Sequence, residues 1–96
     1  MGQVDMEERF HRNPEVEVAP LRSEIVLFNP KNNKFCVLNK SAGVLWESLK
    51  EPRTVGELAS DLCHCFDVGE DSAVHDAQAA VQQLLAAELI RSHPPD

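Results

Sequence analysis

EIVLFNPKNNKFCVL, residues 24–38, is the stretch that decides the fold. It contains two apolar runs, 24–28 and 34–38, and their β-branched and aromatic residues are typical of strands. The NPKNN segment between them suits a tight connection, because Asn and Pro both favour turns. We therefore predict an antiparallel hairpin. Since one hairpin alone is marginally stable, another element must cover its apolar face.

Upstream of the hairpin, Glu and Val alternate over residues 15–18, which indicates a short first strand that Pro20 interrupts. Residues 1–14 are charged and carry few apolar groups, so we predict a flexible N-terminal arm. The folded domain is then expected to span residues 15–91, followed by a C-terminal tail over residues 92–96.

Three helices are predicted downstream of the hairpin. Asn39 or Ser41 can cap the first, in which apolar residues recur at helical spacing. Thr54 and Glu57 form a capping box that opens the second. The third is expected from about residue 71 to residue 88, with an apolar face made of Val74, Ala77, Val81, Leu84 and Leu85.

Strands followed by helices predict an α+β protein, here a winged-helix-like domain with a three-stranded antiparallel sheet followed by three helices. Such a sheet has exposed edges. An edge carries unpaired amides and carbonyls, so it must either be protected or serve as a docking rail for an extended peptide.

Size, composition and charge restrict the function classes. Ninety-six residues make about one small domain, and 43% hydrophobic residues are enough for it to fold. The formal charge of −7 opposes nucleic-acid binding. Since no apolar run reaches the roughly 20 residues that cross a bilayer, and the start does not look like a signal peptide, we expect a soluble, cytoplasmic protein without a membrane partner. The odd number of cysteines fits a reducing compartment.

The Cys63-His64-Cys65 cluster has the ligand types that zinc or copper prefers. On a helix, however, residues two apart point about 200° away from each other, so both thiols cannot face one ion. A redox or metal-responsive protein stays open as an alternative, but core and surface cysteines are the favoured interpretation. No phosphate loop, nucleophile elbow or second ligand pair accompanies the cluster. We therefore expect no catalytic residue, no metal and no cofactor, and predict a binding protein that is not an enzyme.

Four stretches between residues 26 and 90 resemble, in order and spacing, those of the PqqD-like family, which includes the pyrroloquinoline quinone synthesis protein D and the recognition elements of ribosomally made, modified peptides. They are KFCVLN at 34–39, SAGVLWESL at 41–49, RTVGELA at 53–59, and FDV at 66–68 followed by Asp76 and Leu89-Ile90. The resemblance covers about two thirds of the chain. It implies a non-catalytic peptide chaperone that binds the leader of a precursor peptide by strand addition and presents it to a modifying enzyme, such as a radical SAM protein or a leader peptidase.

The resemblance also implies where the leader binds. The rail is Lys34, Phe35, Cys36, Val37 and Leu38, and the facing wall of the third helix is Ala73, Asp76, Ala80 and Gln83, with the adjacent Leu84. Asp76 matches the family's acidic position, where it either pairs with a leader Lys or Arg, accepts a backbone amide, or is an ordinary solvated carboxylate. Ala80 stands where relatives often carry a larger apolar residue, so a deeper groove and a bulky anchor are expected. Relatives usually have Gly-Leu where this chain has Glu88-Leu89, so we expect the third helix to end differently.

Two further readings stay open. A winged-helix DNA-binding regulator would share the fold class, but residues 54–90 contain no Lys or Arg to contact phosphate. A homodimer that pairs its own strand edges is compatible with peptide binding. The sequence identifies neither the precursor, nor the product, nor the enzyme partner.

Overall fold

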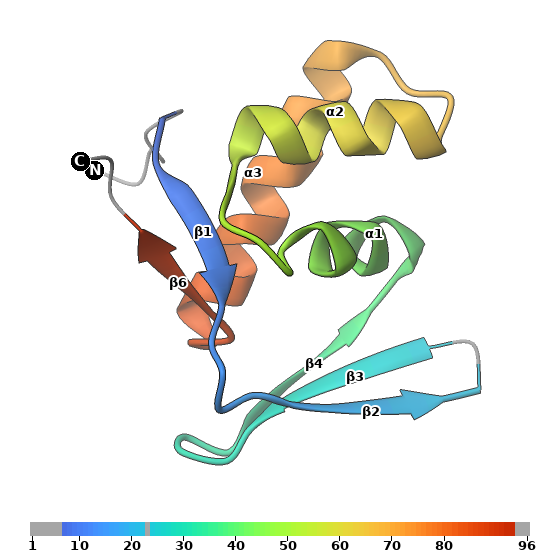
Figure 1. Cartoon of the computed structure of the whole chain (residues 1–96). Coiled ribbons are helices and arrows are strands. Elements are labelled where there is room, and N and C mark those ends of the chain that lie inside the picture. Colours follow the sequence, from blue (N-terminus) through green and yellow to red (C-terminus); the bar gives the residue numbers. More distant parts are fainter. Residues whose placement is uncertain (1–6, 23, 94–96) are drawn as a thin grey trace.

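The computed structural model describes residues 7–22 and 24–93 (Figure 1). The elements follow the chain as β1 (Arg9–Arg12), β2 (Glu17–Leu21), β3 (Glu24–Asn29), β4 (Lys34–Leu38), α1 (Lys40–Ser48), β5 (Arg53–Thr54), α2 (Val55–Cys65), α3 (Glu70–Ala86) and β6 (Ile90–His93). The predicted α+β class and the three helices are confirmed.

The predicted three-stranded antiparallel sheet is present, with strand order β2-β3-β4. Its register places Leu27 of β3 opposite both Val18 of β2 and Cys36 of β4. The first strand runs through Pro20 instead of stopping there. Proline is tolerated at this position because β2 is an edge strand, where one missing donor leaves the inner ladder intact.

A second sheet, with strand order β5-β1-β6, was not predicted. Its central strand β1 lies inside the segment expected to be a flexible arm, and its Phe10 is 0% exposed. The predicted domain start at residue 15 is therefore wrong, because burial of Phe10 ties this segment to the core. Residues 1–6 of the expected arm lie outside the described residues.

The C-terminal boundary also differs from the prediction. β6 pairs with β1 in the register Phe10–Ser92 and Arg12–Ile90, so residues 92 and 93 belong to a strand. Residues 94–96 of the expected tail lie outside the described part of the chain. β1 and β6, which are far apart in the sequence, thus pair with each other.

The helix starts follow the sequence signals closely. Asn39, and not Ser41, caps α1 by accepting the Ala42 amide at 2.8 Å. The predicted capping box opens α2, with Thr54 and Glu57 exchanging their side-chain bonds. α3 begins at Glu70 and ends at Ala86, one residue earlier at its start and two at its end than expected.

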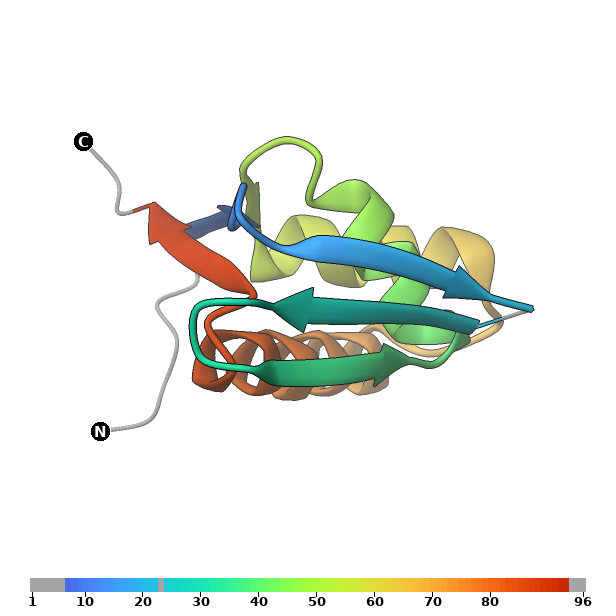
Figure 2. The same ribbon diagram turned by 90° about the horizontal axis from the view of Figure 1, so that it is seen from below.

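The helices cover one face of the β2-β3-β4 sheet and leave the other face open (Figure 2). The core lies between them and includes Leu27, Leu38, Leu45, Trp46, Leu58, Leu62, Val81 and Leu84. Among the described residues, no helix has the length and apolar character needed to cross a bilayer.

Candidate functional site

β4 forms one edge of its sheet. It pairs with β3, and within residues 7–22 and 24–93 no strand pairs with its other side. Successive residues of β4 alternate: one turns its backbone N–H and C=O groups toward β3, and the next turns them outward. The edge can therefore accept the hydrogen bonds of one more strand.

The side chains of β4 alternate between two faces. Cys36 and Leu38 face the core side, where Leu38 is buried and Cys36 packs against the core. Phe35 and Val37 face away from the helices and are 68% and 50% exposed. Of the five predicted rail residues, only Lys34, Cys36 and Leu38 thus point to the helix side. Phe35 and Val37 contribute backbone to the edge and side chains to the open face.

α3 supplies the wall beside this edge. Asp76, Ala80 and Gln83 all line one cavity of about 300 Å³, whose other lining residues come from α1, α2 and the α1 cap. Leu45 and Leu62 contribute apolar surface to it, while Asn39, Ser41 and Asp76 contribute polar atoms. Three of the predicted wall residues are therefore brought together around a hollow with both apolar and acidic character.

Two predicted wall residues do not face this hollow. Ala73 is 0% exposed and Leu84 is 2% exposed, and both belong to the core. The prediction that they line the groove is wrong, because the buried face of α3 is rotated toward Ala73 relative to the expected apolar stripe. Val74 and Leu85, expected in the core, are instead only partly buried.

β4 and α3 run in opposite directions, and we call the strip between them, where the family resemblance places the leader, the groove. At one end, Nζ of Lys34 lies 3.5 Å from the carbonyl oxygen of Ala86, near the last turn of α3. At the other end, Asn39, which follows β4, shares the cavity with Asp76. The groove therefore has a cationic end, which is bridged by Lys34, and an acidic end, which is hollow.

Cys36 lies on the inner face of β4 between these two ends. Its side chain is partly buried, and this burial raises the pKa of the thiol above its ordinary value. The group is thus neutral at physiological pH. It contributes a small apolar surface to the groove and a position for a chemical probe.

Three asparagines hold the hairpin and the β1–β2 link to the residues that follow α3, and sequence analysis missed them. The Nδ2 atoms of Asn13 and Asn29 each donate to the Glu88 carbonyl oxygen at 2.9 Å. Nδ2 of Asn32 donates to the Ala87 carbonyl oxygen at 3.2 Å. We call Asn13, Asn29 and Asn32 the asparagine clamp. The sequence hinted at the clamp only through the several Asn residues in and near the hairpin, and these are explained equally well by the preference of Asn for turns.

The clamp surrounds a residue in an unusual backbone conformation. Glu88 has φ = 56°, the left-handed region that glycine occupies more readily. Glu88 thus adopts a positive φ itself, so the absence of glycine does not prevent this conformation at the helix end. Its backbone carbonyl is held by two of the clamp residues, which offsets part of the cost of that conformation.

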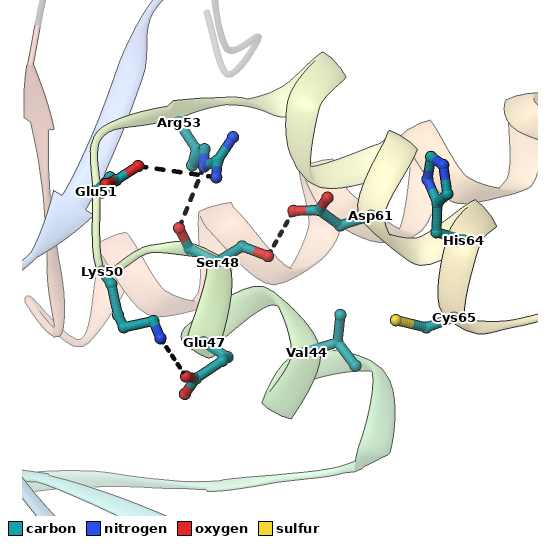
Figure 3. Close-up of a pocket in the computed structure, with 9 residues that line it drawn as sticks. All are labelled: Val44, Glu47, Ser48, Lys50, Glu51, Arg53, Asp61, His64 and Cys65. Carbon is teal, nitrogen blue, oxygen red and sulfur yellow. Dashed lines mark hydrogen bonds and ion pairs between the residues drawn. The ribbon is translucent and has the colours of Figure 1, made fainter.

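A second and wider cavity of about 680 Å³ lies between α1 and α2 (Figure 3). Its charged groups are largely paired with each other: Lys50 with Glu47 at 2.6 Å, and Arg53 with Glu51 at 3.9 Å. The hydroxyl of Ser48 donates to Asp61 at 2.5 Å. These contacts join α1 to α2 and to the segment that links them, which favours a structural role.

The thiols of Cys63 and Cys65 belong to different surfaces. Cys65 lines the wide α1–α2 cavity, whereas Cys63 lines a separate hollow with Glu70 and Asp71 at the start of α3. The ring of His64 is held through Nδ1, 2.8 Å from the Ser60 carbonyl oxygen. Within the residues that the structure describes, no group of His, Cys, Asp and Glu could hold a metal ion.

Comparisons with known proteins bear on the fold and the family. Two solved structures have a similar fold. TbiB1 in complex with the TbiA(beta) leader peptide is 19% identical with a TM-score of 0.76, and the match covers 88% of this chain and 99% of that one. A lasso peptide synthetase B1 complexed with the leader peptide is 24% identical with a TM-score of 0.71, covering 88% and 98%.

A search of curated protein sequences found no significant match. The model of one protein family does match: coenzyme PQQ synthesis protein D (PqqD), over residues 24–90. That span contains the β3–β4 hairpin, all three helices and the groove between β4 and α3. The chain therefore belongs to the PqqD family.

Proposed function

We propose that this protein is a peptide chaperone that binds the leader segment of a ribosomally synthesised precursor. The observation that carries the proposal is the open edge of β4 beside the hollow of α3. Membership of the PqqD family supports it. So do the two proteins of similar fold, since both were solved with a leader peptide bound.

In the proposed complex, the leader adds as a fourth strand next to β4. Backbone hydrogen bonds along Lys34–Leu38 provide affinity and register without depending on leader sequence. Alternate leader side chains then point toward α3, and the others point to the open face of the sheet. Selectivity is thus expected from the first set, which meets the groove.

The hollow at Asp76, Ala80 and Gln83 is the place for the main anchor side chain. Because Ala80 is small, the cavity of about 300 Å³ can take a bulky apolar group. Asp76 is exposed at its rim and can receive a donor at the tip of that group or from a neighbouring leader residue. The carboxylate lies 3.9 Å from Nδ1 of His75, itself highly exposed, so this pairing leaves it accessible to a ligand.

We further propose that the chain performs no bond chemistry and brings the leader to a modifying enzyme, a radical SAM protein or a leader peptidase. The open face of the β2-β3-β4 sheet is the surface offered to that enzyme. It carries Ala19, Leu21, Val26, Phe28, Phe35 and Val37, and its charged residues Glu17 and Glu24 are acidic. An exposed apolar face with acidic neighbours suits a partner with apolar and basic groups.

This face continues into the strand that the leader would add. The outward side chains of the leader would lie next to Phe35 and Val37, so the enzyme would contact chaperone and leader together. Modification becomes faster because the effective concentration of precursor near the enzyme is higher.

We assign the activity to the cytoplasm because Cys36, Cys63 and Cys65 are free thiols, which persist in reducing compartments.

Thiol footprinting tests the proposed binding mode. The probe is the leader half of the short precursor encoded nearest to this gene, and the reagent is an alkylating agent read by mass spectrometry. Cys36 lies on the proposed rail and Cys65 on the far cavity, so Cys65 is the internal control. We expect the leader to slow alkylation of Cys36 and to leave Cys65 unchanged.

An amide NMR titration provides the second readout. Binding at the groove should shift Lys34–Leu38 and the flank of α3 around Asp76 and Ala80. Shifts confined to α1 and α2, with equal alkylation of both cysteines, would reject the groove as the binding site.

A further inference from the structure

The β3–β4 hairpin and α3 are distant in sequence, and polar side chains join them at the C-terminal end of α3. Asn29 and Asn32 lie in the hairpin, and both donate to carbonyl groups just beyond the last turn of α3. Asn13 reaches the same point from the link between β1 and β2. Two separate segments, the hairpin and the β1–β2 link, therefore converge on residues 87 and 88.

The clamp residues are engaged at both ends of their amide groups. While Nδ2 of Asn32 donates toward α3, its Oδ1 accepts the Lys34 amide at 2.9 Å. Asn29 does the same, with Oδ1 accepting the Lys31 amide at 3.0 Å. Each amide side chain thus shapes the hairpin turn and holds it against the helix. Asn13 and Asn29 are only 5% and 2% exposed, so their bonds are made away from solvent.

The Glu88 side chain adds a bond that glycine could not make. Its Oε2 lies 3.1 Å from Nδ2 of Asn32. The same residue adopts the positive φ, and its carbonyl is the common acceptor for Asn13 and Asn29. All three clamp residues therefore donate a hydrogen bond to Glu88, Asn13 and Asn29 to its backbone carbonyl and Asn32 to its side chain.

We infer that the asparagine clamp fixes β4 at the C-terminal end of α3 and thereby sets the geometry of the peptide groove. Lys34, the first residue of β4, also reaches across to the Ala86 carbonyl oxygen at this end. The groove is held shut there by side chains that already span it. We therefore expect a bulky leader side chain to enter at the opposite end, at the hollow next to Asp76.

This inference rests on the proposed function for its effect on peptide binding, but the clamp itself acts in the free protein. Clamp residues are positioning residues, since they are expected to act on the leader through β4. Loosening the clamp should free one end of the hairpin to move relative to α3. The leader would then have to restore the alignment when it binds, which weakens affinity.

Asn32→Asp is the decisive variant in the full-length chain. It preserves the shape of the side chain and the oxygen that accepts the Lys34 amide, but replaces the donor that reaches Ala87 and Glu88 with a carboxylate oxygen. Asn33→Gly is the matched control: Asn33 lies in the same turn with φ = 60°, which glycine accepts, and it is not a clamp residue.

The first readout is amide hydrogen exchange of the free protein. Loss of the clamp donor should speed exchange in the β3–β4 hairpin by about tenfold, the size of one net hydrogen bond, while α2 keeps its wild-type rates. A purely structural role would accelerate hairpin and helices together. That result, or unchanged hairpin exchange in Asn32→Asp, would overturn the inference.

The second readout is calorimetry with the leader half of the precursor encoded nearest to this gene. We expect Asn32→Asp to weaken binding by about tenfold, with Asn33→Gly at the wild-type value. Unchanged affinity in Asn32→Asp would show that the clamp does not shape the groove. If the wild type itself does not bind the leader, the proposed function fails, and hydrogen exchange alone decides whether the clamp fixes β4.

Discussion

The two edges of the β2-β3-β4 sheet offer an approaching peptide different surfaces. β2 contains Pro20, which has no amide hydrogen, and all five of its residues are exposed. β4 contains no proline, buries Leu38, and lies beside α3. Both edges can form backbone bonds, but only β4 has a neighbouring wall to receive side chains. A sheet edge thus becomes a selective binding site when a second element stands next to it.

The strongest way to break this comparison is to fill the hollow beside β4. Ala80→Trp places a large ring where the anchor is expected and should weaken leader affinity about 30-fold or more, the loss typical of a binding hot spot. Ala19→Trp adds the same ring to β2 and should leave affinity near the wild-type value. Isothermal titration calorimetry with the leader peptide measures both. Equal losses in the two variants would show that the α3 wall does not make β4 special.

A second test compares the β4 side of the open face with its β2 side. Phe35→Ser combined with Val37→Ser removes apolar groups beside the leader strand, whereas Leu21→Ser removes one on β2. Because the Phe35 and Val37 side chains point away from the groove, the double variant should still bind the leader. Processing of the precursor by its enzyme should fall about tenfold, as expected for loss of an apolar contact of about 1.4 kcal/mol. If Leu21→Ser has the larger effect, the enzyme docks on the β2 side instead.

A smaller effect is expected from charge at the acidic end of the groove. Asp76→Lys should weaken leader binding about fivefold at low salt and less at high salt, because an exposed ion pair contributes at most about 1 kcal/mol. Glu17→Lys makes the same charge change on β2 and serves as the control. A loss independent of salt would instead assign Asp76 a hydrogen bond to the leader backbone.

The smallest expected effect is on the pH dependence of folding stability, and it compares the thiol of Cys36 on β4 with that of Cys65 on α2. Burial raises the pKa of the Cys36 thiol in the folded state. Because the thiol has a higher pKa in the folded than in the unfolded protein, its contribution to folding stability is fully present below the pKa of the unfolded state. That contribution is lost as the pH rises through the pKa of the folded state. Unfolding by denaturant at neutral and alkaline pH should therefore show a loss of stability that Cys36→Ser reduces. Cys65→Ser, which changes an exposed thiol, should retain the full loss.

Local signals predicted most of the region that carries the proposed site. The hairpin, the capping box at Thr54 and the three helices follow from turn chemistry, side-chain caps and apolar periodicity. These signals depend on residues close together in the sequence, so they do not depend on how the rest of the chain folds. The family resemblance, and not a local signal, pointed to Asp76 and Ala80, which line one cavity in the structure.

Other features could not be predicted from local patterns. Phe10 is a single apolar residue among charges, and its burial depends on β6, more than 75 residues later in the chain. Ala73 and Val74 are adjacent on a broad apolar arc of α3, so the docking angle of the helix decides which of them is buried. Phe35 and Val37 were expected on the leader rail, yet their side chains lie on the face of the sheet that no described helix covers.

By itself, the sequence determined the order of the hairpin and the three helices, the caps of α1 and α2, and the absence of Lys and Arg along α2 and α3. These are properties of short segments, set by backbone preference and side-chain chemistry. Only the tertiary structure decided the second sheet, the faces of β4, the rotation of α3 and the convergence of three asparagines on Glu88. Each of those joins segments far apart in the chain, where burial and geometry outweigh local preference.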